Sequence, residues 1–353
     1  MTIVILSPDE PHLIEGFEKL HLIFNEYDMK VTAYSIKACE KEFITRANNK
    51  RHDITLISNR LTVDTVSYAK GKDAVLVFPS DDVSEQILLD LNLMGVKYIV
   101  TRSTGTDHID LIVASRLGIQ VANIPSYSPE SIAEHALTLM LALCRNIFPA
   151  HQQMLNYNFA LDQLVGTTIR NKTVGVVGFG QTGQAVVEIL KGFKCRILVA
   201  DIKDFSEECK ALGAQQVELE VLYKESEIIT FHVPLTKDTS YMVNAKSIEQ
   251  MKEGVMLINV SRGAVFNSID VYNALQREKI SKLGMDVYEF ENHIFFFDHT
   301  NNPVDDQLLA AFIQHPNVLL TPHQAFLTRE ALEVVAERTI HSLNQFLEKG
   351  GVS

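Results

Sequence analysis

The fold is decided by residues 172–185, which read Lys172-Thr-Val-Gly-Val-Val-Gly178-Phe-Gly180-Gln-Thr-Gly183-Gln-Ala185. Thr173 to Val177 is β-branched and almost wholly apolar, which predicts a buried strand, and a helix is predicted to open at Ala185. The glycines between them have separate uses. Gly178 allows a tight turn, Gly180 lets a ligand approach the backbone, and Gly183 lets the helix pack closely on the strand. The stretch therefore predicts a strand–turn–helix unit of a parallel α/β sheet.

The residues that follow indicate which kind of ligand this turn binds. A second predicted strand, Arg196 to Ala200, ends in Asp201, near the offset of roughly 20 residues at which an acid binds the adenosine ribose 2′-OH. Backbone N–H groups at the start of the helix would bind the pyrophosphate. Glycine clusters alone also mark ordinary turns, but this order of elements favours a dinucleotide site. Asp201 favours NAD over NADP because a carboxylate repels a 2′-phosphate, and Lys203 complicates this only mildly.

Composition and charge exclude several classes of protein. The chain has 353 residues, 46% hydrophobic and 22% charged, as expected of a globular protein with two domains. Its formal net charge of −12 argues against a general affinity for nucleic acid or an anionic membrane. The longest apolar run, about 136–144, is well short of the roughly 18 residues that a membrane helix needs. No signal peptide is visible, and the four cysteines are scattered without a CxxC pair, so we expect a reduced, cytoplasmic protein without a membrane partner.

The first third of the chain alternates apolar strands with helical segments. The predicted strands are Ile3–Leu6, Val31–Ala33, Ile54–Ile57, Ala74–Phe78 and Tyr98–Val100. Continuous apolar strands separated by helices such as Val83–Leu93 predict a parallel sheet covered on both faces, and ligands bind at the carboxyl ends of such strands. The loop that holds Thr104 and Gly105 follows the last of these strands. Its small residues fit either an anion-binding nest of N–H groups or a plain tight turn, and both interpretations stay open.

The middle of the chain predicts a buried helix. Ser128 is a suitable N-cap, Pro129 suits the first helical position, and Glu130 places an acid in the first turn. The helix should run to about Arg145 and is apolar on nearly all faces, so we expect it between domains or in a subunit interface. Further strands are predicted at Ile228–Val233, Val255–Val260, Leu283–Val287 and Val318–Leu320, and an amphipathic helix at Thr328 to about Lys349.

Three groups that suit one reaction follow strand ends in the second half. Arg262, Glu291 and His323 each have an ordinary interpretation alone: a surface ion pair, a solvated loop acid, and a capping or core histidine. Beside a dinucleotide site they have a joint purpose. Hydride transfer to a 2-keto acid needs a cation for the carboxylate, a proton donor for the carbonyl oxygen, and an anion that stabilises the charged donor.

These motifs resemble those of the D-isomer-specific 2-hydroxyacid dehydrogenases over nearly the whole chain, and most closely those of the fermentative D-lactate branch. They are Gly178-Phe-Gly-Gln-Thr-Gly183, His232-Val-Pro-Leu-Thr236, Asn259-Val-Ser-Arg-Gly263, Gly284-Met-Asp-Val-Tyr-Glu289 and Pro322-His-Gln-Ala-Phe-Leu-Thr328. The resemblance implies two doubly wound parallel-sheet α/β domains. A flavodoxin-like substrate domain would comprise residues 1–127 and the C-terminal helix 326–353, and a Rossmann NAD-binding domain residues 128–325.

The resemblance also implies a role for each site residue. Arg262 would bind the substrate carboxylate and polarise the keto oxygen, His323 would be the acid/base, and Glu291 its partner. Thr104, Gly105 and Tyr127 would complete the site for a small 2-keto or 2-hydroxy acid. Residues implied to bind NAD are Gly178, Gly180, Gln181, Thr182, Gly183, Asp201, Val233, Pro234, Val260, Arg262 and Asp286.

The family further implies a homodimer or higher homo-oligomer, paired through the helix that begins near Ser128. A relative acting on another 2-keto acid, such as phenylpyruvate, hydroxypyruvate or a branched one, would keep every motif. NAD-sensing corepressors share the triad but have a His-x-Ala-Trp pattern, where this chain has His323-Gln-Ala-Phe326 and no Trp. His293 and His299 lie in a Phe-rich loop without a spaced set of carboxylates or cysteines, so no metal site is expected.

Overall fold

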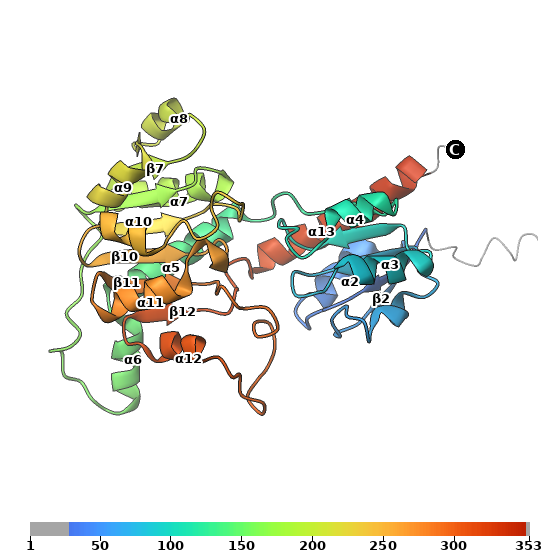
Figure 1. Cartoon of the computed structure of the whole chain (residues 1–353), viewed down its shortest axis with the longest axis horizontal. Helices are drawn as coiled ribbons and strands as arrows, with labels where there is room; N and C mark the ends of the chain where they lie inside the picture. The colour runs from blue at the N-terminus through green and yellow to red at the C-terminus, as the bar shows by residue number, and fades with distance from the viewer. Residues whose placement is uncertain (1–27, 351–353) are drawn as a thin grey trace, which may run out of the picture. The chain divides into compact units, whose positions relative to one another are not determined.

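The computed structural model describes residues 28–350, with side chains as far as 348, and it divides into two compact units (Figure 1). One unit comprises residues up to Ile124 together with Ala336 onward, and the other is Pro125–Val335. The domain limits expected from the sequence were 127/128 and 325/326. The predicted strand Ile3–Leu6 lies outside the described residues.

The first unit is a parallel sheet of five strands in the order β2-β1-β3-β4-β5. The strands are β1 (Lys30–Ala33), β2 (Asp53–Leu56), β3 (Ala74–Val77), β4 (Tyr98–Thr101) and β5 (Gln120–Ala122). This is the flavodoxin-like order, which confirms the predicted fold class. The first four follow the predicted runs closely, whereas β5 is too short and too polar to have been predicted.

Short helices and one end of a long helix pack on this sheet. They are α2 (Lys41–Asn48), the 3-10 helix η1 (Val66–Ala69), α3 (Glu85–Leu93), α4 (Leu111–Arg116) and the C-terminal end of α13 (Arg329–Gly350). Residues far apart in the chain meet here. The Phe346 ring stacks on Tyr98 with centroids 4.6 Å apart, and Asn344 Oδ1 lies 2.9 Å from His52 Nε2. The chain therefore returns to its first unit at its end.

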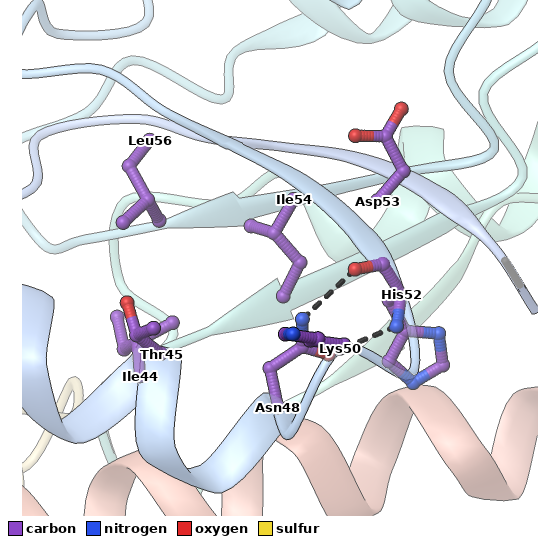
Figure 2. Close-up of a pocket in the computed structure, with 8 residues that line it drawn as sticks. All are labelled: Ile44, Thr45, Asn48, Lys50, His52, Asp53, Ile54 and Leu56. Atoms are coloured by element: carbon purple, nitrogen blue, oxygen red, sulfur yellow. Dashed lines mark hydrogen bonds between the residues drawn. The ribbon is translucent and has the colours of Figure 1, made fainter. Parts of the chain in front are cut away.

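A cavity of about 220 Å³ lies between α2 and β2 (Figure 2). The Asn48 side chain accepts a hydrogen bond from His52 N (3.0 Å) and donates one to His52 O (2.8 Å), which fixes the turn from α2 into β2. Ile54 and Lys50 also line the cavity. None of the predicted site residues is among its lining residues.

The second unit is a parallel sheet of seven strands in the order β12-β11-β10-β9-β6-β7-β8. The strands are β6 (Thr173–Val177), β7 (Arg196–Ala200), β8 (Gln215–Gln216), β9 (Ile228–Phe231), β10 (Val255–Asn259), β11 (Ile280–Met285) and β12 (Val318–Leu320). The strand order reverses direction between β6 and β9, which is the switch point at which Rossmann folds bind dinucleotides. The predicted Rossmann domain is confirmed.

Helices cover both faces of this sheet. They are α5 (Pro129–Cys144), α6 (Ile147–Leu155), α7 (Gln181–Lys191), α8 (Ser206–Ala211), α9 (Leu219–Glu225), α10 (Ala245–Gln250), α11 (Ser268–Gln276) and α12 (Gln307–Gln314), with η2 (Gly263–Val265). The apolar helix α5 is capped as predicted, because Ser128 accepts a hydrogen bond from Ser131 N. It packs against α7 and strands β10, β11 and β12 of its own unit.

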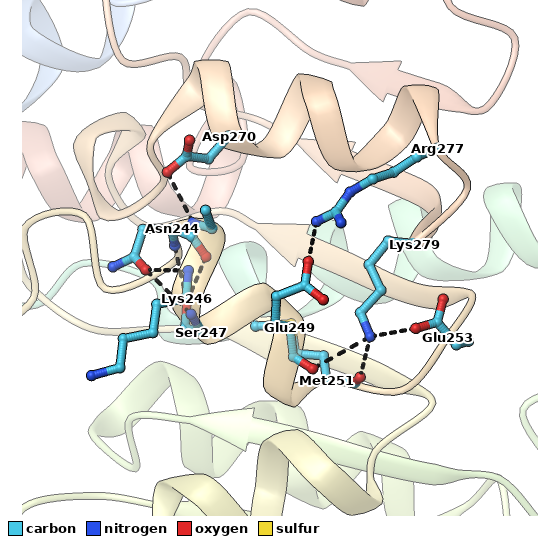
Figure 3. Close-up of polar contacts among 10 residues, drawn as sticks. Asn244, Lys246, Ser247, Glu249, Met251, Glu253, Asp270, Arg277 and Lys279 are labelled. Carbon is cyan, nitrogen blue, oxygen red and sulfur yellow. Dashed lines mark hydrogen bonds and ion pairs between the residues drawn. The ribbon is translucent and has the colours of Figure 1, made fainter.

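A polar cluster joins α10, α11 and the start of β11 (Figure 3). Lys279 is 5% exposed, and its Nζ donates to Glu253 Oε1 (2.7 Å) and to Met251 O (2.8 Å). Asn244 caps α10 by accepting from Ser247 N, while Ser247 Oγ accepts from Asn244 N in return. The buried ammonium of Lys279 is tolerated because its hydrogen bonds to Glu253 Oε1 and Met251 O compensate for lost hydration.

No helix in the described part of the chain is long and apolar enough to cross a membrane.

Candidate active site

The glycine turn has the geometry that a pyrophosphate requires. Gly178 has φ +91°, and a Cβ there would lie 2.6 Å from His232 O. A Cβ on Gly183 would lie 2.1 Å from Gly178 O, whereas one on Gly180 would meet no described atom within 4 Å. Helix α7 begins at Gln181 with no side-chain cap from Gly180, so its first N–H groups face outward at a positive helix end.

Asp201 lies beside the glycine turn. It follows β7, and its Oδ2 accepts from Phe179 N (2.7 Å) inside the glycine turn. Its Oδ1 accepts from the backbone N of Lys203 (2.9 Å). Lys203 itself is exposed. A carboxylate has about four acceptor positions, and these two contacts leave room for ribose hydroxyls.

The remaining predicted cofactor residues line the same edge of the sheet. Val233 and Pro234 follow β9, Val260 follows β10, and Asp286 follows β11. Strands β6, β9, β10 and β11 are consecutive in the sheet and parallel, so their carboxyl ends form one edge. Residues of the described structure therefore fit a dinucleotide placed along that edge.

The side chains of His323 and Glu291 form a direct hydrogen bond. His323 Nδ1 lies 2.6 Å from Glu291 Oε1, and the side chains are 20% and 19% exposed. Glu291 Oε2 accepts from Tyr288 N (2.8 Å), which orients the carboxylate. The Phe296 ring lies 5.5 Å from the imidazole. A carboxylate on Nδ1 leaves Nε2 as the nitrogen available to a substrate.

Arg262 reaches the same neighbourhood through a close backbone contact. A Cβ on the adjacent Gly263 would lie 2.2 Å from Tyr288 C, so the chain after β10 lies against the segment that carries Glu291. Buried Asn259 fixes the turn, accepting from Ser261 N (3.0 Å) and donating to Arg262 O (3.0 Å).

Tyr127 also belongs to this neighbourhood. Burial raises the pKa of its phenol, Arg262 lowers it and Asp286 raises it, so both charged groups act on the ring. Its ring meets Phe326 edge-on with centroids 6.2 Å apart. The structure thus pairs His323 with Glu291 and places Tyr127 under the electrostatic influence of Arg262 and Asp286.

Thr104 and Gly105 lie in the other unit, on a firmly held loop. Thr104 Oγ1 donates to Ile124 O (2.8 Å), and Ser103 Oγ donates to Gly105 O (2.7 Å). The buried Arg102 anchors the end of β4 to Glu40 at 3.2 Å. Within residues 28–348, neither amide N–H of Thr104 and Gly105 has a hydrogen-bond partner, as an anion-binding nest would require.

Two polar residues that had no predicted role, His135 and Thr321, lie against Asp286, which is one of the residues implied to bind NAD. Asp286 is fully buried, and its Oδ1 lies 3.4 Å from His135 Nε2 of helix α5 and accepts from Thr321 Oγ1 at 2.6 Å. His135 was missed because it sits in a helix that is apolar on nearly all faces. The signal was present: an imidazole on a buried helix face needs a partner.

In the described residues, no three His, Cys, Asp or Glu side chains gather as metal ligands would. His299 Nε2 instead lies 2.9 Å from Ile294 O.

Comparison with known proteins decides the family. Residues 137–325 match the model of the D-isomer specific 2-hydroxyacid dehydrogenase, NAD binding domain. The chain belongs to this family. It is 41% identical to the D-lactate dehydrogenase of Escherichia coli (strain K12) over 91% of this chain and 98% of that protein. It is 36% identical to an aromatic 2-oxoacid reductase of Clostridium sporogenes, over 91% of this chain and 97% of that one.

A solved structure titled as the pyruvate reductase of Chlamydomonas reinhardtii superposes with a TM-score of 0.87 at 37% identity. The superposition covers 92% of this chain and 98% of the Chlamydomonas chain. The chain is thus an NAD-dependent oxidoreductase of the D-2-hydroxyacid dehydrogenase family, as the sequence predicted.

Proposed function

We propose that this dehydrogenase interconverts pyruvate and D-lactate. The observation that carries the proposal is the 2.6 Å contact between His323 Nδ1 and Glu291 Oε1 beside the turn of Arg262. The similarity to a D-lactate dehydrogenase and to a pyruvate reductase supports this choice of substrate.

Each residue of the set has its own part in the reaction. NADH, when bound, supplies the hydride that C2 of the keto acid receives. The Arg262 guanidinium binds the carboxylate and polarises the keto oxygen. His323, bonded to Glu291 through Nδ1, gives the proton on Nε2 to that oxygen, and it takes the proton back in lactate oxidation. Glu291 stabilises the imidazolium and fixes the orientation of the ring.

The remaining predicted residues would complete the two binding sites. Tyr127 would contact the substrate, and the N–H groups of Thr104 and Gly105 would hold its carboxylate. Asp201 would bind the adenosine ribose, and the first N–H groups of α7, at Gln181 and Thr182, would bind the pyrophosphate.

The test is NADH oxidation with pyruvate by the wild-type protein and by His323→Ala. Loss of a general acid should lower kcat by ~10²–10⁴-fold, and the lactate formed should be the D-enantiomer. Equal rates for the two proteins, or L-lactate as product, would contradict the assignment. His341→Ala, at an exposed histidine of α13, is the matched control.

Reduction of an aromatic 2-keto acid is the second candidate, because an aromatic 2-oxoacid reductase is 36% identical to the chain. A panel of pyruvate, phenylpyruvate, hydroxypyruvate and 2-ketoisocaproate, compared by kcat/KM with NADH and then NADPH, separates the two. A higher kcat/KM for phenylpyruvate than for pyruvate would assign the enzyme to aromatic 2-keto acids instead of pyruvate.

We further propose a homo-oligomer, at least a dimer, in the cytoplasm. An arm of residues 147–165 carries eight large apolar side chains that are at least half exposed: Ile147, Phe148, Met154, Leu155, Tyr157, Phe159, Leu161 and Val165. None of the residues of α6 is buried in the single chain. Apolar patches of this kind usually meet another protein surface.

All four cysteines are free, in keeping with a reducing compartment such as the proposed cytoplasm.

A further inference from the structure

The turn that carries His323 is held in an uncommon conformation. His323 has φ +54°, in the left-handed region that non-glycine residues rarely adopt. Such a conformation persists only where its surroundings determine it. Its N–H donates to Asp286 O (2.7 Å), and the next two N–H groups, of Gln324 and Ala325, donate to Asp286 Oδ1 and Oδ2 (both 2.8 Å).

The Asp286 carboxylate is itself held from the other side. Thr321 Oγ1 donates its only proton to Asp286 Oδ1 at 2.6 Å, so its oxygen must accept from His135 Nε2, 3.0 Å away. His135 is on α5, 186 residues before Thr321 in the chain, and its side chain is 16% exposed. A continuous path of hydrogen bonds thus runs from α5 to the backbone N–H groups of Gln324 and Ala325, directly after His323.

We propose that His135, acting through Thr321 and Asp286, is a positioning residue that holds the proton-donating histidine in place. This rests on the proposed function in assigning the proton transfer to His323. Helix α5 packs directly on α7, β10 and β11, so it is a rigid element from which to fix the turn. A displacement of a catalytic group by 1 Å can cost about 10²-fold in rate, which gives such a path a purpose.

A purely structural role is the competing explanation. An imidazole and a hydroxyl could simply satisfy each other in the core, and their loss would then lower stability alone. The two explanations differ in what happens to kcat and in whether the effect depends on His323. Substrate affinity should be spared, because His135 contacts only Thr321 and Asp286 among the residues of the site, and neither is assigned to the substrate.

The experiment compares variants that remove or keep each hydrogen bond. His135→Leu removes the imidazole donor, and His135→Gln keeps an N–H near the Nε2 position. Thr321→Val removes the hydroxyl at constant shape, and Thr321→Ser keeps it. Thr138→Val, which loses an exposed hydroxyl one turn further along α5, is the matched control. Thermal unfolding of each variant first shows that it is folded.

We expect His135→Leu and Thr321→Val to lower kcat for 2-keto acid reduction about 10-fold, within the range of a sub-ångström displacement. KM for the keto acid should change less than 2-fold. His135→Gln and Thr321→Ser should keep most of the wild-type rate. In a His323→Ala background, His135→Leu should have no further effect, since residues that act through one group are not additive.

Three results would overturn the proposal: an unchanged kcat in both removal variants, an equal loss with and without His323, or a change confined to KM. If the wild-type protein reduces no 2-keto acid, the proposed function fails instead. The positioning role is then still decided by proton NMR of histidine-labelled protein. The His323 Nδ1 proton shared with Glu291 should exchange faster in His135→Leu than in the wild type, and an unchanged resonance would overturn the proposal.

Discussion

A carboxylate bonded to Nδ1 of a histidine does two things for the ring. It selects the tautomer that presents Nε2, and it stabilises the imidazolium that exists before proton transfer. Glu291 is itself held by Tyr288 N, so the pair keeps one orientation. The segment that carries Glu291 packs on Gly263, so the histidine–carboxylate pair lies near the turn of Arg262.

Glu291→Gln should therefore slow pyruvate reduction while leaving the protein folded. A hydrogen bond to a charged group contributes about 1.5–3 kcal/mol, which corresponds to roughly a 10- to 100-fold loss of kcat. Steady-state kinetics with NADH measure it. Glu289→Gln is the control, because that carboxylate accepts from Tyr241 Oη (2.6 Å) and Ser268 N (2.9 Å) instead of a histidine. Similar losses in the two variants would contradict the role of Glu291.

His232 is a histidine of a different kind. Burial lowers its pKa to about 3. Although part of the residue remains accessible, Nδ1 is closed to solvent and unpartnered among the described residues, and Nε2 lies 2.9 Å from Thr230 Oγ1. The folded protein therefore keeps it neutral, whereas the unfolded chain protonates it below about pH 6.5. Its contribution to stability is complete above that pH and is lost as the pH falls towards 3.

His232→Gln should therefore flatten the dependence of stability on pH. The midpoint of thermal unfolding of the wild type should fall more steeply between pH 6.5 and pH 4.5 than that of the variant. The comparison is differential, so other titrating groups such as Asp81, whose pKa burial raises, affect both proteins alike. Parallel curves would show that His232 is not kept neutral by the fold.

Sequence reasoning grouped Arg262, Glu291 and His323 because each follows a strand end of one parallel sheet, where side chains can converge. It could not find His135, since nothing in an apolar helix says which residue it faces 186 positions later. The left-handed backbone of His323 was equally hidden, because a conformation imposed by Asp286 leaves no mark in local sequence.

At the scale of elements, the glycines of the β6–α7 turn have separable roles that substitution can reveal. Gly183→Ala would place a Cβ 2.1 Å from Gly178 O and should destabilise the fold by about 1–3 kcal/mol, as overpacking does. Gly180→Ala meets no described atom within 4 Å, so it should fold like the wild type. It should nevertheless bind NADH more weakly, because the Cβ occupies the space where backbone approaches pyrophosphate.

Thermal unfolding and NADH titration, made on both variants, measure the two roles. A Gly180→Ala protein with unchanged NADH affinity would remove the turn from the cofactor site. A Gly183→Ala protein as stable as the wild type would mean that α7 can move away from β6, contrary to its close packing.

Strands and long helices were predictable because their apolar runs are continuous. β6, β7 and β12 have the predicted limits, and α5 begins at its predicted cap. β5 and β8, of three and two residues, carry too little pattern to be recognised. The location of α5 was open between a domain boundary and a subunit interface. Its packing on α7 and three strands shows that most of its apolar surface serves the core of its own unit.

At the scale of the whole molecule, the fold class follows from the alternation of apolar strands and helices, whereas the flavodoxin-like and Rossmann arrangements were expected only from the resemblance to the family. Chain crossing between units is a similar case. Nothing in the periodicity of α13 says that its end packs on Tyr98 and His52, some 250 to 290 residues earlier, so only resemblance to the family suggested it.

The arm of residues 147–165 should govern assembly. Phe159 and Leu161 are 65% and 74% exposed, more than a single chain normally leaves on one short segment. Changing both to Asp would place charges where a second copy should bury apolar surface, which is costly without a partner for the charge. Light scattering should then report the mass of one chain instead of a multiple of it. Leu93→Asp, at an 84% exposed leucine on α3, is the control and should leave the oligomer intact. A wild-type protein that is already monomeric, or an unchanged mass in the arm variant, would show that this surface does not pair copies of the chain.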